Sequence, residues 1–289
     1  SGAEANEAAI KLARRRGKTR GGPDKHHIVC LEGSFHGRTL GTLQATWAQQ
    51  KKAPFEPLPA GFSHVRPNDR AALRAAVGPT TAAILLEPVQ GEGGVHALEP
   101  GFLALARELC DAHDALLICD EVQTGIGRCG AWLASRRLGV EPDAVTLAKG
   151  LASGIPIGAL VTRRLADGFA PGDHATTFGA TPPVAAAALA VLDTIVAEDL
   201  LGNVERVGEH LRDRLAGVPG VASVRGLGLL IAIELGGGDA PEVARRLLQT
   251  EHVLVNAVSP TALRLCPPLC LSIEDADHAV AAISRALAI

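Results

Sequence analysis

Two short apolar runs, each followed by a residue that can do chemistry, constrain the fold of this chain most. Residues 115–119 (A-L-L-I-C) are followed directly by Asp120. Residues 144–148 (A-V-T-L-A) repeat the pattern and are followed by Lys149. Runs of this length, bounded by glycine-rich segments, predict buried strands. Because ligands of an open α/β sheet bind at the carboxyl ends of its strands, Asp120 and Lys149 are predicted to share a site at that edge.

Further strands and helices alternate along the first two-thirds of the chain. Short apolar runs predict more strands, and apolar residues at helical spacing predict helices between them. This alternation indicates an α/β fold whose parallel sheet is joined by crossover helices. The additional strands are expected over residues 28–31, 82–86 and 157–161, and helices over 71–77 and 102–110.

The last third of the chain predicts a small α+β domain. We place the boundary near Ala197, which gives a large domain over 1–197 and a small one over 198–289. The expected elements are a strand over 221–235, a helix over 241–250, short strands near Val253 and Leu263, and a closing helix capped at Ser272.

Composition excludes several classes of protein. The chain has 289 residues and a formal net charge of -3, so nothing favours nucleic acid or an anionic membrane as a partner. It lacks an apolar run of the roughly 18 residues that a membrane span needs, and no signal peptide is expected. The six cysteines lack zinc spacing, so no metal site is expected. Cys30 and Cys119 are predicted to be buried free thiols, which favours a reducing, cytoplasmic location.

Two nucleotide-binding motifs are matched only in part. Gly17-Lys18-Thr19 has Leu12 where a phosphate loop requires its first glycine. Residues 125–130 (G-I-G-R-C-G) fit the dinucleotide fingerprint, but polar residues separate them from the strand and no clear helix follows. We interpret residues 125–130 as a loop. A lysine in the apolar, glycine-rich context of Lys149 could be buried and act as a Schiff-base nucleophile toward an aldehyde cofactor, and Asp120 could face a pyridinium nitrogen.

The run from Asp120 (D-E-V-Q-T-G-I-G-R) and the run T-L-A-K-G resemble the class III aminotransferases of fold type I, which use pyridoxal phosphate. The match extends in order from Ser1 almost to the C-terminus, and within the class it is strongest to the acetylornithine aminotransferases. It implies a mostly parallel central sheet flanked by helices, with a small C-terminal α+β domain. It also implies a homodimer that transfers an ω-amino group from N-acetylornithine, or a similar amino donor, to 2-oxoglutarate.

The resemblance assigns cofactor roles residue by residue. Lys149 would carry the cofactor and shuttle a proton, and Asp120 would keep the pyridine nitrogen protonated. The S-G-A-E-A-N run at Ser1 predicts a well-capped helix or an anion site, and the family uses it to bind phosphate. The other cofactor contacts implied are Gly2 and Ala3 (phosphate, through backbone N–H groups), Phe35 and Val122 (the two ring faces), Gln123 (the phenolic oxygen), and Thr176 and Thr177, of which Thr177 would serve the neighbouring subunit's phosphate.

Three charged residues are implied in substrate binding. Arg38 of the F-H-G-R run would bind a substrate carboxylate, whereas His36 could equally be structural. Arg264 would bind the second carboxylate of glutamate. Glu92 would neutralise Arg264 when the substrate has no carboxylate there.

Several alternatives stay open. An ornithine or 4-aminobutyrate aminotransferase would keep nearly all of these residues, while an aminomutase would have no use for Arg264. A non-catalytic paralogue would not need Lys149 and Asp120. Because the chain opens inside a family motif, we expect the large domain to lack its N-terminal part, and residues 1–289 alone to aggregate or to bind the cofactor weakly.

Overall fold

A computed structural model describes residues 1–163 and 168–288. The chain forms two compact units whose segments interleave. This division differs from two consecutive domains, because two short segments of the first half of the chain belong to unit 2. The longest segment of that unit starts at Thr194, three residues before Ala197. Unit 1 comprises Ser1–Pro88, Leu98–Ile126 and Leu133–Asp193, and unit 2 comprises Val89–Ala97, Gly127–Trp132 and Thr194–Ile289.

Unit 1 is built on a six-stranded sheet with the strand order β2-β1-β3-β6-β7-β8. All its neighbouring strands are parallel except β8, which runs antiparallel to β7. Its strands are β1 (His27–Leu31), β2 (Phe62–Val65), β3 (Thr81–Leu86), β6 (Leu116–Asp120), β7 (Ala144–Leu147) and β8 (Ala159–Thr162). Its helices are α1 (Gly2–Gly21), α2 (Leu40–Ala45), α3 (Gln49–Lys52), η1 (Ala53–Phe55), α4 (Arg70–Ala76), α5 (Pro100–Ala112), α6 (Ala134–Arg137) and η2 (Lys149–Ala152), and α7 (Pro182–Ala197) starts in this unit.

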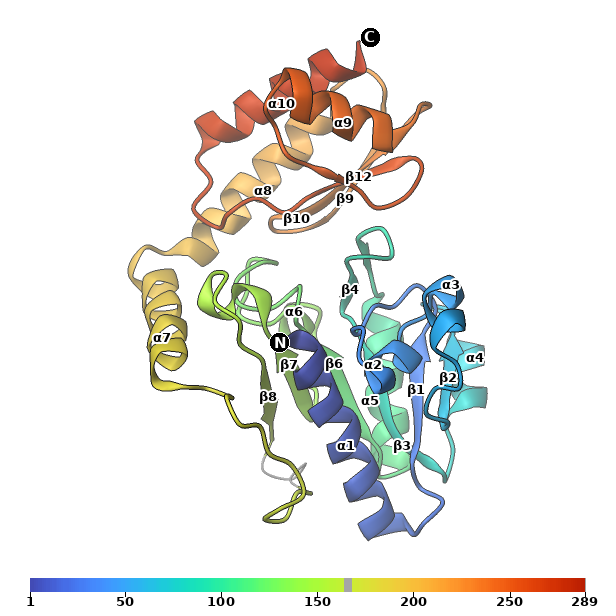
Figure 1. Cartoon of the computed structure of the whole chain (residues 1–289). Helices are drawn as coiled ribbons and strands as arrows, with labels where there is room; N and C mark the ends of the chain where they lie inside the picture. The colour runs from blue at the N-terminus through green and yellow to red at the C-terminus, as the bar shows by residue number, and fades with distance from the viewer. Residues whose placement is uncertain (164–167, 289) are drawn as a thin grey trace. The chain divides into compact units, whose positions relative to one another are not determined.

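Helices cover both faces of this sheet, which explains why its central strands are mostly apolar on both faces. The buried face of α1 packs on alternate residues of the strands, among them Ile28, Leu85 and Ile118. The intervening residues, such as Ile84 and Leu117, are also fully buried and point to the opposite face. Figure 1 shows α1 in front of the sheet and α5 behind it.

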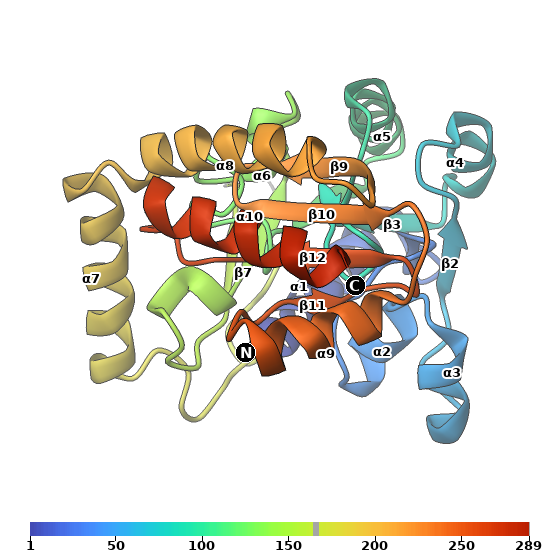
Figure 2. The ribbon, with the colours of Figure 1, turned by 90° about the horizontal axis from the view of Figure 1, so that it is seen from above.

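Unit 2 has a four-stranded antiparallel sheet with the order β11-β12-β10-β9. Three amphipathic helices cover one face of this sheet, and Figure 2 shows them from above with the strands beneath. A two-stranded hairpin, β4-β5, also belongs to this unit. The elements are β4 (Val89–Gln90), β5 (His96–Ala97), α8 (Leu200–Ala216), β9 (Val221–Leu227), β10 (Leu230–Leu235), α9 (Ala240–Thr250), β11 (Asn256–Ala257), β12 (Ala262–Leu265) and α10 (Ile273–Leu287).

Two sequence predictions in unit 2 were wrong. The strand expected over residues 221–235 is two strands, β9 and β10, joined by a tight turn. Gly226, near the end of β9, and Gly228, in the turn itself, have φ angles of 131° and 54°, which glycine adopts easily, so the chain can reverse after β9. The short strand expected near Val253 is β11, at Asn256–Ala257.

Other expectations of local structure were confirmed. Cys30 and Cys119 are buried free thiols, and burial raises the pKa of Cys30 to about 12. Residues 125–130 lie in turns, and the first helix after them is the four-residue α6. Among the described residues, no helix has the length and apolar character that a membrane span requires.

His64 gives unit 1 a testable pH dependence. Its ring lies 5.4 Å from that of Trp47, and its Nε2 is 2.8 Å from the carbonyl oxygen of Ala45. Burial lowers the pKa of His64 from 6.5 to about 4, so the folded protein favours the neutral ring. The contribution of the neutral His64 ring to the free energy of unfolding is therefore fully present above pH 6.5 and is lost as the pH falls toward 4. We expect His64→Gln to flatten the fall of the unfolding midpoint between these pH values, measured by thermal denaturation; an unchanged slope would contradict this prediction.

Candidate active site

The start of α1 meets the carboxyl ends of β6 and β7. A Cβ atom placed on Gly2 would lie 2.7 Å from Cγ1 of Val122 and 3.5 Å from Cβ of Ala148. Val122 follows Asp120 closely, and Ala148 immediately precedes Lys149. Glycine at position 2 therefore permits a close approach that brings the first turn of α1 to the two predicted catalytic residues.

The first turn of α1 is suited to bind an anion. Ser1 caps the helix, and its Oγ accepts a hydrogen bond from the N–H of Glu4 at 3.3 Å. The first hydrogen bond of the helix runs from the N–H of Ala5 to the carbonyl oxygen of Ser1, so the N–H groups of Gly2 and Ala3 are not used within the helix and are available to a ligand. The positive end of the helix dipole adds to the attraction of a phosphate.

Asp120 is held in one orientation by a buried network. Its Oδ2 accepts hydrogen bonds from Nδ2 of Asn6 at 2.7 Å and from Nδ1 of His36 at 2.8 Å. Its Oδ1 accepts one from the N–H of Val122 at 3.0 Å, with Oγ1 of Thr146 at 3.4 Å. The residue is only 3% exposed. Buried polar groups need hydrogen-bond partners, and these contacts hold the carboxyl group of Asp120 in one orientation at the end of β6.

The partners of Asp120 also hold one another. Thr146 donates to Oδ1 of Asn6 at 2.7 Å, and Nδ2 of Asn6 also donates to the carbonyl oxygen of His36 at 2.8 Å. The backbone N–H of His36 donates to Oγ1 of Thr46 at 2.9 Å. The second ring nitrogen of His36 is buried without a hydrogen-bond partner in the described part of the chain.

Asn6 and Thr146 were not among the predicted site residues, although the sequence carries a signal for both. Asn6 interrupts the apolar face of the first helix, and Thr146 interrupts an apolar strand. A polar residue at a position bound for the core needs a partner there. Each was therefore a candidate to contact Asp120.

Lys149 follows β7 and starts the short helix η2 in an unusual conformation. Its φ angle is 43°, in the left-handed region that non-glycine residues rarely adopt. Such conformations are concentrated at functional sites. The residue is exposed, so the expectation that its apolar context buries it was wrong. The apolar residues Leu147 and Ala148 are buried instead, because they belong to the strand and its end.

Phe35 and Arg38 lie together on the loop after β1. The half-buried ring of Phe35 has Cζ of Arg38 at 5.7 Å from its centroid and Nζ of Lys51 at 5.3 Å. The N–H of Phe35 donates to Oε1 of Glu87 at 2.9 Å, which fixes the loop to the end of β3. Two cations therefore lie beside one aromatic ring, where they favour a bound carboxylate.

The remaining predicted cofactor residues are less constrained. Val122 and Gln123 are half-buried in the turn after β6. Thr176 and Thr177 are exposed, in a loop before α7. No described contact joins these two threonines to Asp120 or Lys149, and their service to a neighbouring subunit stays a prediction.

Arg264 and Glu92 form an ion pair within unit 2. Nη1 of Arg264 is 2.7 Å from Oε1 of Glu92, and Nε of Arg264 donates to Oδ1 of Asn256 at 3.0 Å. The arginine side chain is 12% exposed and the glutamate side chain 37% exposed. The predicted pairing is therefore present, between residues that are distant in the sequence.

Glu121 has a structural role. Its carboxylate accepts hydrogen bonds from the N–H groups of Ala134 and Ser135 at 3.0 and 2.7 Å, and from the hydroxyl of Thr124. Burial raises its pKa, and these hydrogen bonds oppose that shift. Glu121 thus caps the first turn of α6.

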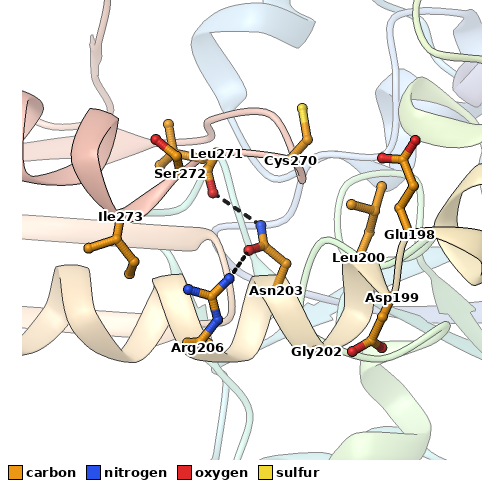
Figure 3. Close-up of a pocket in the computed structure, with 10 residues that line it drawn as sticks. All are labelled: Glu198, Asp199, Leu200, Gly202, Asn203, Arg206, Cys270, Leu271, Ser272 and Ile273. Carbon is orange, nitrogen blue, oxygen red and sulfur yellow. Dashed lines mark hydrogen bonds between the residues drawn. The ribbon is translucent and has the colours of Figure 1, made fainter.

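A separate pocket lies in unit 2 at the N-terminal ends of α8 and α10 (Figure 3). Asn203 donates to the carbonyl oxygens of Leu269 and Leu271 at 2.7 and 3.1 Å, and Arg206 donates to Asn203 at 2.6 Å. These contacts join α8 to the segment before α10. The pocket lining includes none of the predicted site residues.

Comparisons with known proteins agree with this geometry. The family model of the class-III aminotransferases matches residues 1–287. Acetylornithine aminotransferase 1 of Bordetella pertussis is 48% identical over 289 residues, which cover 97% of this chain and 72% of the relative. The structure of N-acetylornithine aminotransferase from Stenotrophomonas maltophilia superposes with a TM-score of 0.83 at 35% identity, covering 100% of this chain and 73% of that one. The structure of ornithine aminotransferase from Toxoplasma gondii superposes with a TM-score of 0.93 at 34% identity, covering 100% of this chain and 71% of that one. With its mostly parallel sheet, buried aspartate and strand-end lysine, this chain belongs to the class-III aminotransferase family.

Proposed function

We propose that this chain moves the ω-amino group of N-acetylornithine, or of a similar ω-amino acid, to 2-oxoglutarate with the help of pyridoxal phosphate. The observation that carries the proposal is the Arg264–Glu92 ion pair. An enzyme whose two substrates differ in charge needs an arginine that binds a carboxylate of one substrate and is neutralised when the other is bound. Curated relatives that are 43–48% identical to this chain are named acetylornithine aminotransferases, which supports the choice of donor.

The residues of unit 1 fit pyridoxal phosphate. The open N–H groups of Gly2 and Ala3 suit its phosphate, and the buried, oriented carboxylate of Asp120 suits its ring nitrogen. Lys149 provides a primary amine that can bind its aldehyde. When bound, the group supplies an electron sink for the bond-breaking at the substrate carbon.

Each residue has a defined task in the proposed reaction. Asp120 would hold a proton on the ring nitrogen of the cofactor through its carboxylate. Lys149 would hold the cofactor through its amine, and its Nζ would then move a proton to and from the substrate carbon. Gln123 would donate to the phenolic oxygen of the cofactor, and Phe35 and Val122 would restrict the ring from its two faces.

The two substrates differ in where they carry charge. N-acetylornithine carries its carboxylate far from the reacting amine, and Arg38 would bind it there. Glutamate carries a second carboxylate beside the reacting amine, which Arg264 would bind. Glu92 neutralises Arg264 while the ω-amino donor is bound, since an uncompensated charge beside the substrate would be costly.

The proposal extends to assembly and location. We infer a homodimer, in which the exposed Thr177 of one subunit serves the phosphate site of the other. We also infer a cytoplasmic location, with which the buried free thiols are compatible.

A substrate panel tests the proposed activity. Acetylornithine, ornithine and 4-aminobutyrate are each incubated with 2-oxoglutarate and the protein loaded with pyridoxal phosphate, and glutamate formation is measured. The highest kcat/KM is expected for acetylornithine. A preference for ornithine or 4-aminobutyrate would assign the chain to another activity of its family, and no turnover with any donor would refute the proposal.

Arg264→Ala is expected to separate the two half-reactions. Loss of a charged hydrogen-bonding partner typically costs about 2–5 kcal/mol, and here only glutamate uses that partner. The glutamate half-reaction should therefore be damaged far more than the acetylornithine half-reaction, as measured by single-turnover absorbance changes. Arg38→Ala should impair both halves, because Arg38 serves both substrates. Equal damage to both halves from Arg264→Ala would contradict this division of roles.

A further inference from the structure

Arg225 lies in the same cross-strand row as Arg264. Ala232 of β10 pairs with Arg225 of β9 on one side and with Arg264 of β12 on the other, and Arg264 pairs with Asn256 of β11. Residues directly opposite each other in an antiparallel sheet point to the same face. The two arginines therefore share a face, separated by the small side chain of Ala232.

This face is opposite the helices of unit 2. Ile231 and Ile233, which flank Ala232 in β10, belong to the core that packs under α8 and α10. Alternation along β10 then directs Ala232 and Glu234 to the other face. The β4-β5 hairpin lies on that face, where β5 packs beside β9.

The two arginines hold the same hairpin in different ways. Arg264 binds a side chain, that of Glu92, at 2.7 Å. Arg225 binds the backbone: its Nε donates to the carbonyl oxygen of Gly94 at 2.8 Å. Gly94 has a φ angle of 108°, so the hairpin tip bends at the residue that Arg225 holds.

Arg225 is itself firmly placed. Its Nη1 is 2.9 Å from Oε2 of Glu234, and the other oxygen of that carboxylate accepts a hydrogen bond from Thr261 at 2.5 Å. The hydrogen bonds from Thr261 and then Arg225 lower the pKa of Glu234, so the pair stays charged at neutral pH. The side chains of Arg225 and Glu234 are 24% and 30% exposed, which limits solvent screening.

We propose that Arg225 is a positioning residue that holds the Glu92 hairpin over Arg264 and thereby sets the balance between the two substrates. The inference rests on the proposed function of Arg264 and Glu92. With the hairpin anchored at Gly94, Glu92 covers Arg264 whenever the ω-amino donor is bound. Without that anchor, the Glu92–Arg264 ion pair is formed for less of the time. The ω-amino donor then binds beside an uncompensated positive charge, whereas the second carboxylate of glutamate binds Arg264 more readily.

Arg225→Ala should therefore lower kcat/KM for acetylornithine roughly tenfold, which corresponds to the loss of one charge-assisted hydrogen bond. The kcat/KM for glutamate should stay unchanged or rise. Arg264→Ala changes the same ratio in the opposite direction, so general damage to the fold cannot imitate the result. Amide hydrogen exchange over residues 89–97 should also become faster in Arg225→Ala, which can be measured by mass spectrometry whether or not the protein is active.

Further variants make the test specific. Arg225→Lys keeps the charge but has one nitrogen in place of the two that bind Gly94 and Glu234, and Glu234→Gln weakens the support of Arg225, so both should give smaller shifts in the same direction. Arg245→Ala is the matched control, because Arg245 forms its ion pair with Glu242 on the exposed surface of α9.

Unchanged exchange in residues 89–97, an unchanged substrate ratio, or an equal shift in Arg245→Ala would overturn the inference. Wild-type protein without turnover on either substrate would instead overturn the proposed function. The exchange measurement would then decide by itself whether Arg225 holds the hairpin.

Discussion

Lys149→Ala is expected to abolish both the covalent attachment of pyridoxal phosphate and turnover. Lys149 is assigned two tasks, binding the cofactor and moving the proton, and alanine can perform neither. Proton transfer by a positioned group alone contributes about 10²–10⁴-fold. With both tasks lost, the fall in kcat should reach at least roughly 10⁴-fold.

Borohydride reduction followed by peptide mapping checks the assignment of Lys149. In the wild type the cofactor label should be found on the peptide that contains Lys149, and in Lys149→Ala it should be absent. Lys18→Ala is the matched control, since Lys18 is an exposed lysine in the last turn of α1. A label on another lysine, or turnover that survives in Lys149→Ala, would refute the assignment.

The left-handed backbone at Lys149 makes a second variant informative. Lys149→Arg keeps the positive charge and tolerates the same backbone conformation, but a guanidinium stays protonated and is a poor nucleophile. It should be as inactive as Lys149→Ala while the stability of the fold is retained, as measured by thermal denaturation. Loss of folding in both variants would indicate a structural role for Lys149 instead.

The sequence predicted the parts of the fold whose signal is local. The central strands of unit 1 are covered by helices on both faces, so each appears as a continuous apolar run that ends in polar residues. For that reason β3, β6 and β7 were predicted to within a residue or two, and Asp120 and Lys149 were predicted at the ends of strands. The resemblance to class III aminotransferases then supplied the roles.

The interleaving of the two units could not be predicted in this way. The hairpin at 89–97 joins unit 2 through contacts such as that between Gly94 and Arg225, which are 131 residues apart. The segment 127–132 joins it through Arg128, which donates to the carbonyl oxygens of Leu229 and Pro267 at 3.1 and 2.5 Å. Such contacts have no periodic signal in the sequence.

Two local errors have different physical causes. The run from Val221 to Leu235 appears as one long strand because Gly226 and Gly228 lie among apolar residues, although their positive φ angles allow the chain to reverse after β9. The burial expected for Lys149 failed because the apolar neighbours that suggested it are themselves part of β7 and its end. An apolar sequence context thus indicates a buried strand without burying the residue that follows it.

Asp120→Asn is expected to bind the cofactor and lose most of its turnover. The carboxylate supplies the charge that keeps a proton on the ring nitrogen, and a neutral amide cannot. Removal of one preorganised electrostatic group typically costs roughly 10²–10³-fold in kcat. The affinity for pyridoxal phosphate should change much less, because the phosphate contacts at Gly2 and Ala3 are untouched.

The network around Asp120 adds a structural consequence that can be measured separately. Asn6 and the backbone of Val122 each donate to one oxygen of the carboxylate, so an amide at position 120 must direct its own NH₂ group at one of these donors. The buried conflict should lower the unfolding midpoint. Asp114→Asn is the matched control, because Asp114 pairs with Arg16 and Arg20 away from the site.

A pH titration of the NMR chemical shift of the ring nitrogen, in protein loaded with pyridoxal phosphate that is isotopically labelled at that nitrogen, tests the role of Asp120 directly. In wild-type protein the spectrum should show a protonated ring throughout the range in which the enzyme is stable, whereas Asp120→Asn should lose that proton at lower pH. Full activity in Asp120→Asn, or a spectrum with the wild-type pH dependence, would show that another group holds this proton. His36, whose Nδ1 lies 2.8 Å from the carboxylate, could not replace the missing negative charge, because an imidazole ring is either neutral or positively charged.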